Sequence, residues 1–131
     1  MKSTVGELLD IFLGLQALDQ QLEKVAPATR FRMGILLGRL RPVAVAYDRA
    51  HSEAVRRITN DNEGMHQNVG VMNSIMTEEI AKLREQEHEV AVGRLTYGEL
   101  KMEENPKVGA LALSQVMPII DGIPEEMTGG S

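Results

Sequence analysis

The chain has 131 residues, of which 43% are hydrophobic and 25% charged, and its net charge at pH 7 is −5. This composition is typical of a single globular domain, and the absence of cysteine excludes disulfide scaffolds, thiol nucleophiles and thiolate metal centres. The 3% of aromatic residues disfavours nucleic-acid binding by base stacking, and no apolar run reaches the roughly 20 residues that span a bilayer.

The first helix is predicted over residues 5–25. The residues before it do not form a signal peptide, which predicts a cytoplasmic protein with no membrane partner. Thr4 and Glu7 have the spacing of a capping box, and Pro27 ends the helix because the residue before a proline is pushed out of the helical region. One face is apolar, at spacings of three and four residues: Leu8, Phe12, Leu15, Leu18, Leu22 and Val25.

The second helix is predicted over residues 28–58 and would span roughly 45 Å at 1.5 Å per residue. That is longer than a compact domain of this size requires, so we expect the helix to project or to pair with another copy of the chain. Pro42 lies inside it and predicts a kink near Gly38–Pro42. The helix carries a heptad seam, which also predicts self-association: Met33, Leu37, Leu40, Ala44, Tyr47, His51, Ala54 and Ile58.

The last part of the chain changes its pattern twice. Turn-forming residues at 59–64 predict a break, and a third, acidic helix follows from residue 65 or 68 to residue 89. Beyond it we predict strands at Val90–Leu95 and Lys107–Leu113, and a short helix capped by Ser114 that reaches Ile120.

These elements predict a mainly α fold in a single domain over residues 1–131. A long antiparallel helical hairpin with a third helix would form the core over residues 1–89. A small two-stranded β element with a short helix would occupy residues 90–124, and residues 125–131 would be a mobile tail.

Basic residues gather in the second helix, since residues 26–58 carry a net charge of +5 while residues 59–131 carry −8. On a helical wheel, Arg30 and Arg41 lie beside two glycines, each of which costs roughly 1 kcal/mol in a helix interior. Either the glycines admit a neighbouring helix and the arginines pair with the acidic third helix, or the patch binds an anion. The candidate ligand-binding residues are Arg30, Arg32, Gly34, Gly38, Arg39 and Arg41.

Two acid-x-x-His pairs, Asp48 with His51 and Glu85 with His88, have a spacing found in di-iron helical bundles. The second pair falls on the polar side of the third helix, and the first helix offers no buried glutamate as a further ligand. We therefore expect no metal and no cofactor. The chain also lacks a phosphate-binding glycine loop and a nucleophile elbow, and we expect no catalytic residue.

Several segments resemble small helical proteins encoded by tailed bacteriophages and prophages. They are residues 5–9 and 15–18, residues 29–32, 37–42 and 47–50, the Glu-Val-Ala-Val run at 89–92 and the Leu-Ser-Gln-Val-Met-Pro-Ile-Ile run at 113–120. The resemblance covers most of the chain in layout. It implies a phage accessory or structural protein in the cytoplasm of a bacterial host, and it assigns no site residue.

We therefore expect a non-enzymatic, oligomeric binding module for an anionic ligand, for which a nucleotide-type signal of host defence is one candidate. The alternative is a phage structural or assembly component whose arginine-rich helix binds an acidic protein surface. The expected partners are a second copy of the chain and either an anionic small molecule or an acidic protein.

Overall fold

The computed structural model describes residues 2–61 and 69–124, and they form a mainly helical fold, as predicted. The helices are α1 (Val5–Gln21), α2 (Pro27–Asp61), α3 (Val69–Glu85) and α4 (Ala110–Val116), with short 3-10 turns η2 (Gly98–Leu100), η3 (Met102–Glu104) and η4 (Met117–Ile119). The strands are β1 (Lys2–Thr4), β2 (Glu87–Glu89), β3 (Leu95–Thr96) and β4 (Ile120–Asp121).

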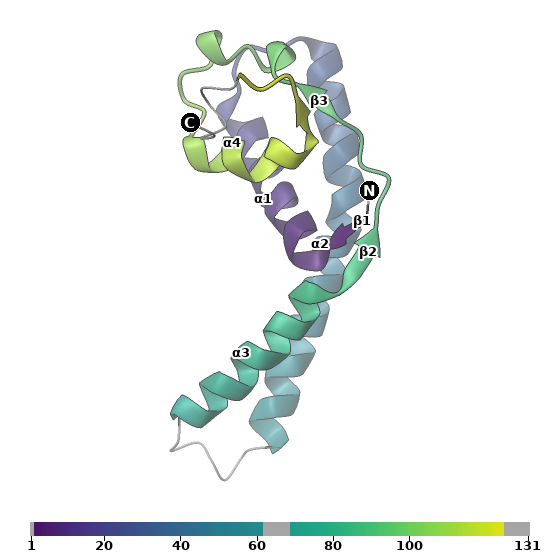
Figure 1. Ribbon diagram of the computed structural model, residues 1–131, viewed down its shortest axis with the longest axis vertical. Coiled ribbons are helices and arrows are strands. Elements are labelled where there is room, and N and C mark those ends of the chain that lie inside the picture. The colour runs from purple at the N-terminus through teal and green to yellow at the C-terminus, as the bar shows by residue number, and fades with distance from the viewer. Residues whose placement is uncertain (1, 62–68, 125–131) are drawn as a thin grey trace.

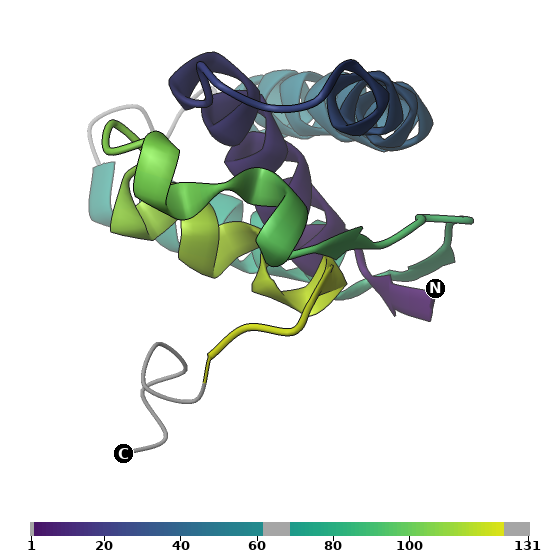
Figure 2. The same cartoon turned by 90° about the horizontal axis from the view of Figure 1, so that it is seen from above.

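Helices α1 and α4 with the first half of α2 form what we call the head. The second half of α2 and α3 project from it as an antiparallel hairpin (Figure 1). In the head, α1 lies between α2 on one side and α4 on the other, as the view from above shows (Figure 2). Helix α2 runs the full length of the molecule, and α3 packs against its distal half, outside the head (Figure 1). The 35 residues of α2 correspond to roughly 52 Å. Its expected projection is therefore confirmed, with α3 as the helix that accompanies it.

Helix α1 is the centre of the hydrophobic core. Its start is fixed by the predicted capping box, in which the Glu7 amide donates to Thr4 Oγ1 and the Thr4 amide donates to the Glu7 carboxylate, both at 3.2 Å. Apolar side chains point from α1 in several directions and are buried against α2, α3 and α4. They are Leu8, Leu9, Ile11, Phe12, Leu15 and Leu18.

A glycine sets the distance between α1 and α4. A Cβ atom on Gly14 would lie 2.6 Å from Gln115 Cβ, 2.9 Å from Val116 Cγ1 and 3.0 Å from the Ala112 carbonyl oxygen. Carbon atoms do not approach so closely, so this crossing requires a residue without a side chain. The close helix approach expected beside Gly34 and Gly38 thus occurs at Gly14, in another helix.

The heptad seam of α2 is partly covered within the chain. Met33, Leu37 and Leu40 belong to the same buried cluster as the α1 side chains, and Ile58 is buried in the half of α2 that packs on α3. The other four seam residues are half-buried: Ala44, Tyr47, His51 and Ala54. The self-association that the seam predicted stays a prediction. Helix α2 continues through Pro42 without interruption.

The C-terminal part differs from the prediction. The strand predicted at Lys107–Leu113 is wrong, because α4 begins at Ala110 and packs Ala112, Leu113 and Val116 against α1 at helical spacing. A short apolar run has no period that separates strand from helix. Ser114 does not cap a helix; its hydroxyl donates to the Leu111 carbonyl inside α4.

The strands also pair differently. Of the strand predicted at Val90–Leu95, only Leu95 belongs to a strand, β3. β3 pairs in parallel with β4, with Leu95 beside Ile120, while β1 pairs antiparallel with β2, with Ser3 beside His88. The third helix ends at Glu85, before the predicted residue 89. The predicted mobile tail, residues 125–131, lies outside the described residues.

A buried amide fastens the loop after η3 to the end of α1. Asn105 is 2% exposed, and its Oδ1 accepts hydrogen bonds from the amides of Glu23 at 2.8 Å and Lys24 at 2.7 Å. Its Nδ2 lies 2.9–3.0 Å from the carbonyl oxygens of Lys24, Leu100 and Lys101. One side chain therefore satisfies backbone groups from two segments that are about 80 residues apart in sequence.

We predict that Gly14→Ala destabilises the protein by about 1–3 kcal/mol, although alanine favours a helix, because the added methyl group forces α1 and α4 apart. Urea denaturation followed by circular dichroism measures the change. Gly34→Ala, where a Cβ would meet nothing within 4 Å, is the matched control and should not lower stability. Equal stability of wild type and Gly14→Ala would contradict the close crossing.

We also predict that Asn105→Ala lowers the free energy of unfolding by about 2–4 kcal/mol, because it leaves buried backbone amides and carbonyls without partners. Glu103→Ala, an exposed change in the neighbouring η3, should stay within about 0.5 kcal/mol of wild type. Thermal melting of the two variants side by side makes the comparison, and similar melting temperatures would show that Asn105 does not fasten the loop.

Candidate binding surfaces on α2

The first predicted site residue, Arg30, fastens α2 to the end of α1. Its Nη1 donates to the Asp19 carboxylate at 2.8 Å and to the Asp19 carbonyl at 3.1 Å, and its Nη2 donates to the Leu22 carbonyl at 2.8 Å. Helix α1 has no basic residue in its own last turn, so this guanidinium supplies the positive charge and the donors that a helix C-terminus attracts.

Arg32 joins α2 to the segment that contains β3. Its guanidinium donates to the Glu99 carboxylate, which also accepts from the Thr29 hydroxyl at 3.0 Å. The other Glu99 oxygen accepts from the backbone amide and the hydroxyl of Thr96, at 2.7 and 2.8 Å. Burial raises the pKa of Glu99, but these hydrogen bonds and the Arg32 charge outweigh it and hold the pKa below its ordinary value.

The remaining predicted residues lie on the exposed part of α2. Arg39 donates to the Ala91 carbonyl at 3.0 Å, and Arg41 is exposed. Gly34 and Gly38 are also exposed, and a Cβ on either would meet nothing within 4 Å. The six residues thus share one half of α2, but the guanidiniums of Arg30 and Arg32 point to different acids and do not converge with the others on one anion site.

The glycines belong to an apolar strip on the outer face of α2, opposite the buried seam. Phe31 is 70% exposed, Ile35 38% and Val45 53%. Six residues at helical spacing, none of them charged, form what we call the outer strip: Phe31, Gly34, Ile35, Gly38, Pro42 and Val45. On the helical wheel Arg30 and Arg41 flank it on one side, and Arg32 and Arg39 on the other.

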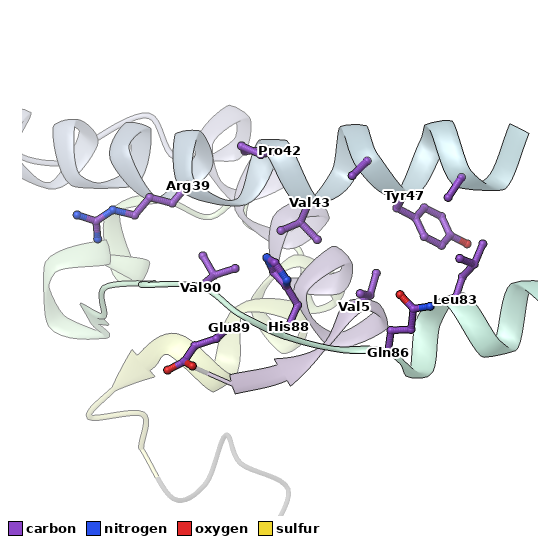
Figure 3. Close-up of a pocket in the computed structure, with 12 residues that line it drawn as sticks. Val5, Arg39, Pro42, Val43, Tyr47, Leu83, Gln86, His88, Glu89 and Val90 are labelled. Atoms are coloured by element: carbon purple, nitrogen blue, oxygen red, sulfur yellow. The ribbon is translucent and has the colours of Figure 1, made fainter. Parts of the chain in front are cut away.

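A groove lies beside the outer strip, between α2 and the segment that joins α3 to β2 (Figure 3). It has a volume of about 600 Å³. Arg39, Gln86, His88 and Glu89 contribute polar groups, and the apolar lining comes from three parts of the chain: Val5, Pro42, Val43, Ala46, Tyr47, Ala50, Leu83 and Val90. Sequence reasoning missed this groove, because it assigned His88 to a helix that ends at Glu85.

The two acid-histidine pairs lie on different elements of the fold. His51 is half-buried on α2 with its ring centroid 5.8 Å from that of Tyr47, whereas His88 is exposed in β2. Among residues 2–61 and 69–124, no three histidine, aspartate or glutamate side chains gather where they could hold a metal ion. Within the same residues, no helix combines the length and apolar character needed to cross a membrane.

An ion pair connects α2 with the acidic α3. Arg57 Nη2 lies 3.2 Å from Glu79 Oε2. The basic and acidic helices therefore complement each other at this point in the distal hairpin, while the predicted site residues lie nearer the head.

Comparisons of the chain with protein-family models, with curated protein sequences and with solved structures gave no match. The surfaces of α2 therefore have to be interpreted from their own chemistry.

We predict that Glu99→Gln destabilises the fold by about 1–2 kcal/mol at neutral pH, because it removes the charge that pairs with Arg32 and weakens the bonds to Thr29 and Thr96. The folded-state pKa is lowered, so the stabilisation is complete above the ordinary value of 4.5 and is lost as the pH falls through the folded value. Urea denaturation from pH 7 to pH 3 should show the two proteins converging in acid. A difference that does not depend on pH would contradict the ionic role.

Proposed function

We propose that the protein is a non-enzymatic docking protein whose outer strip binds an amphipathic helix of another protein, with acidic residues along the flanks of that helix. The exposure of Phe31 carries this proposal, because 70% of a phenylalanine side chain faces solvent at the end of an uncharged strip on an ordered helix. Burial of such a side chain is worth about 1.5–3 kcal/mol, which makes it a natural anchor in a helix-to-helix contact.

The glycines fit the same partner. A Cβ on Gly34 or Gly38 would meet nothing within 4 Å, so among residues 2–61 and 69–124 no close contact requires a glycine at either position. Each glycine nevertheless costs the helix roughly 1 kcal/mol. A partner helix can approach closely over such small residues.

The charges beside the strip favour an acidic partner. Arg41 is exposed, and Arg39 donates to a neutral carbonyl, so the two keep their positive charge on opposite sides of the strip. A second copy of the chain would bring these like charges together, whereas glutamates on a partner helix would neutralise them. A small anion would find fewer donors on this surface, because Arg30 and Arg32 already pair with acids of the protein itself.

This proposal corresponds to the structural or assembly role among the two functions expected from the sequence. The resemblance to phage-encoded helical proteins makes a phage protein in the host cytoplasm the first kind of partner to examine. An acidic amphipathic helix in such a protein is the feature to search for.

The proposal predicts that a helical peptide with a leucine and alanine seam and glutamate flanks binds the protein, and that the same peptide with lysine flanks does not. Fluorescence anisotropy at moderate ionic strength measures both. Phe31→Ser should weaken binding by about tenfold or more. Leu111→Ser is the matched control, since Leu111 is 72% exposed but lies on α4, and it should leave binding unchanged.

Two glycine variants test whether the partner helix approaches closely at the outer strip. Gly34→Ala and Gly38→Ala should each raise the stability of the free chain, by up to about 1 kcal/mol, and weaken peptide binding. Misfolding cannot produce this combination. Equal binding of both peptides would rule out the acidic partner. Dimerisation that Phe31→Ser abolishes, seen by sedimentation velocity, would instead assign the strip to a second copy.

A further inference from the structure

The groove between α2 and β2 has the size and chemistry of a small-molecule site. Its volume of about 600 Å³ is within the range of sites that bind organic ligands, which are mostly apolar with a few polar groups that fix orientation. Val43 on α2 faces Val5 across it, so its middle offers apolar surface on both sides (Figure 3). Ala46 and Leu83 add to the apolar lining.

The polar groups are arranged unevenly along the groove. Arg39 lies at one end, near Val90, while Tyr47, Leu83 and Gln86 lie at the other end (Figure 3). His88 extends from β2 toward α2 between these ends, and the Glu89 carboxylate points away from α2 (Figure 3). The end near Arg39 therefore offers a guanidinium, which suits an anionic group, while the imidazole lies toward the middle of the groove.

Arg39 retains donors for such a group. A guanidinium carries five N–H donors, and the contact with the Ala91 carbonyl uses one of them, on Nη1. This contact also fixes the side chain beside the groove, so less conformational freedom is lost when an anion binds. Arg39 is one of the residues that the sequence singled out for anion binding, and the other predicted arginines do not line the groove with it.

From these positions we infer that the groove binds an amphipathic organic anion: a carboxylate or phosphate held by Arg39, joined to an alkyl chain that runs past His88 and covers Val43, Ala46 and Leu83. A free alkyl carboxylate and the acyl chain and headgroup of an anionic lipid share this chemistry. The groove adjoins the outer strip on the next face of α2: Pro42 belongs to both, and Arg39, which lines the groove, also flanks the strip.

Isothermal titration calorimetry of the full chain with hexanoate, octanoate and decanoate tests the site. Affinity should rise about two- to fourfold with each added methylene, because each one buries apolar surface in the groove. Octylammonium, with the same chain and the opposite charge, should bind at least about tenfold more weakly. Acetate should not bind measurably.

Two variants test separately the contributions of the anionic group and of the alkyl chain to binding. Arg39→Gln should weaken octanoate binding about tenfold and reduce the preference over octylammonium. Ala46→Phe fills the apolar middle and should remove the dependence on chain length. Arg41→Gln and Phe31→Ser change residues of α2 outside the groove and should leave octanoate binding unchanged. Circular dichroism melting establishes that each variant is folded, and Ala46→Phe, which keeps the Arg39 contact, tests the site if Arg39→Gln unfolds.

A final arm identifies the source of the anion. Co-sedimentation with vesicles of phosphatidylglycerol and phosphatidylcholine, lost in Arg39→Gln and Ala46→Phe, would assign the groove to a lipid. Octanoate binding without vesicle binding would assign it to a free anion. The inference is wrong if neither probe binds, if affinity does not change with chain length, or if Arg41→Gln weakens binding as much as Arg39→Gln.

Discussion

The helix α1 carries apolar side chains around most of its circumference, so it can fold only where other elements cover it from several directions. Helix α2 covers one side and α4 the other, and Gly14 lets α4 come close enough to exclude water. The end of α1 is held by Arg30 from α2 and by Asn105 from the loop after η3. The position of α2, and with it the placement of every candidate binding surface, follows from the burial of this one helix.

Helix α2 has two apolar faces, and only one of them serves the fold. Its inner seam packs on α1 and α3, and its outer strip faces solvent, with the groove at the boundary between the two. A helix needed only to complete the core would carry polar residues on its outer face. The arginines follow the same division. Arg30 and Arg32 act within the fold, while Arg39 and Arg41 lie where a partner or a ligand can reach them.

Local patterns predicted the parts of the structure that local energetics determine. The capping box at Thr4, the apolar face of α1 and the seam of α2 depend on residues three or four positions apart, which a sequence displays directly. The pairing of β1 with β2 and the hydrogen bonds of Asn105 depend on segments about 80 residues apart, and the groove brings residues 39–50 together with residues 83–90. Gly14 and Gly34 look alike in sequence, and only the approach of α4 makes one of them indispensable.

The connectivity of the head also bears on the order in which the protein can fold during synthesis. Helices α2 and α3 are neighbours in sequence and can pair soon after both have left the ribosome. Helix α1 emerges first, but α4, which covers its Gly14 side, follows almost 100 residues later. Contacts of such long range close slowly, and until they form α1 exposes leucine side chains to other nascent chains. The newly made protein is therefore most prone to aggregation in the interval between the emergence of α3 and the docking of α4.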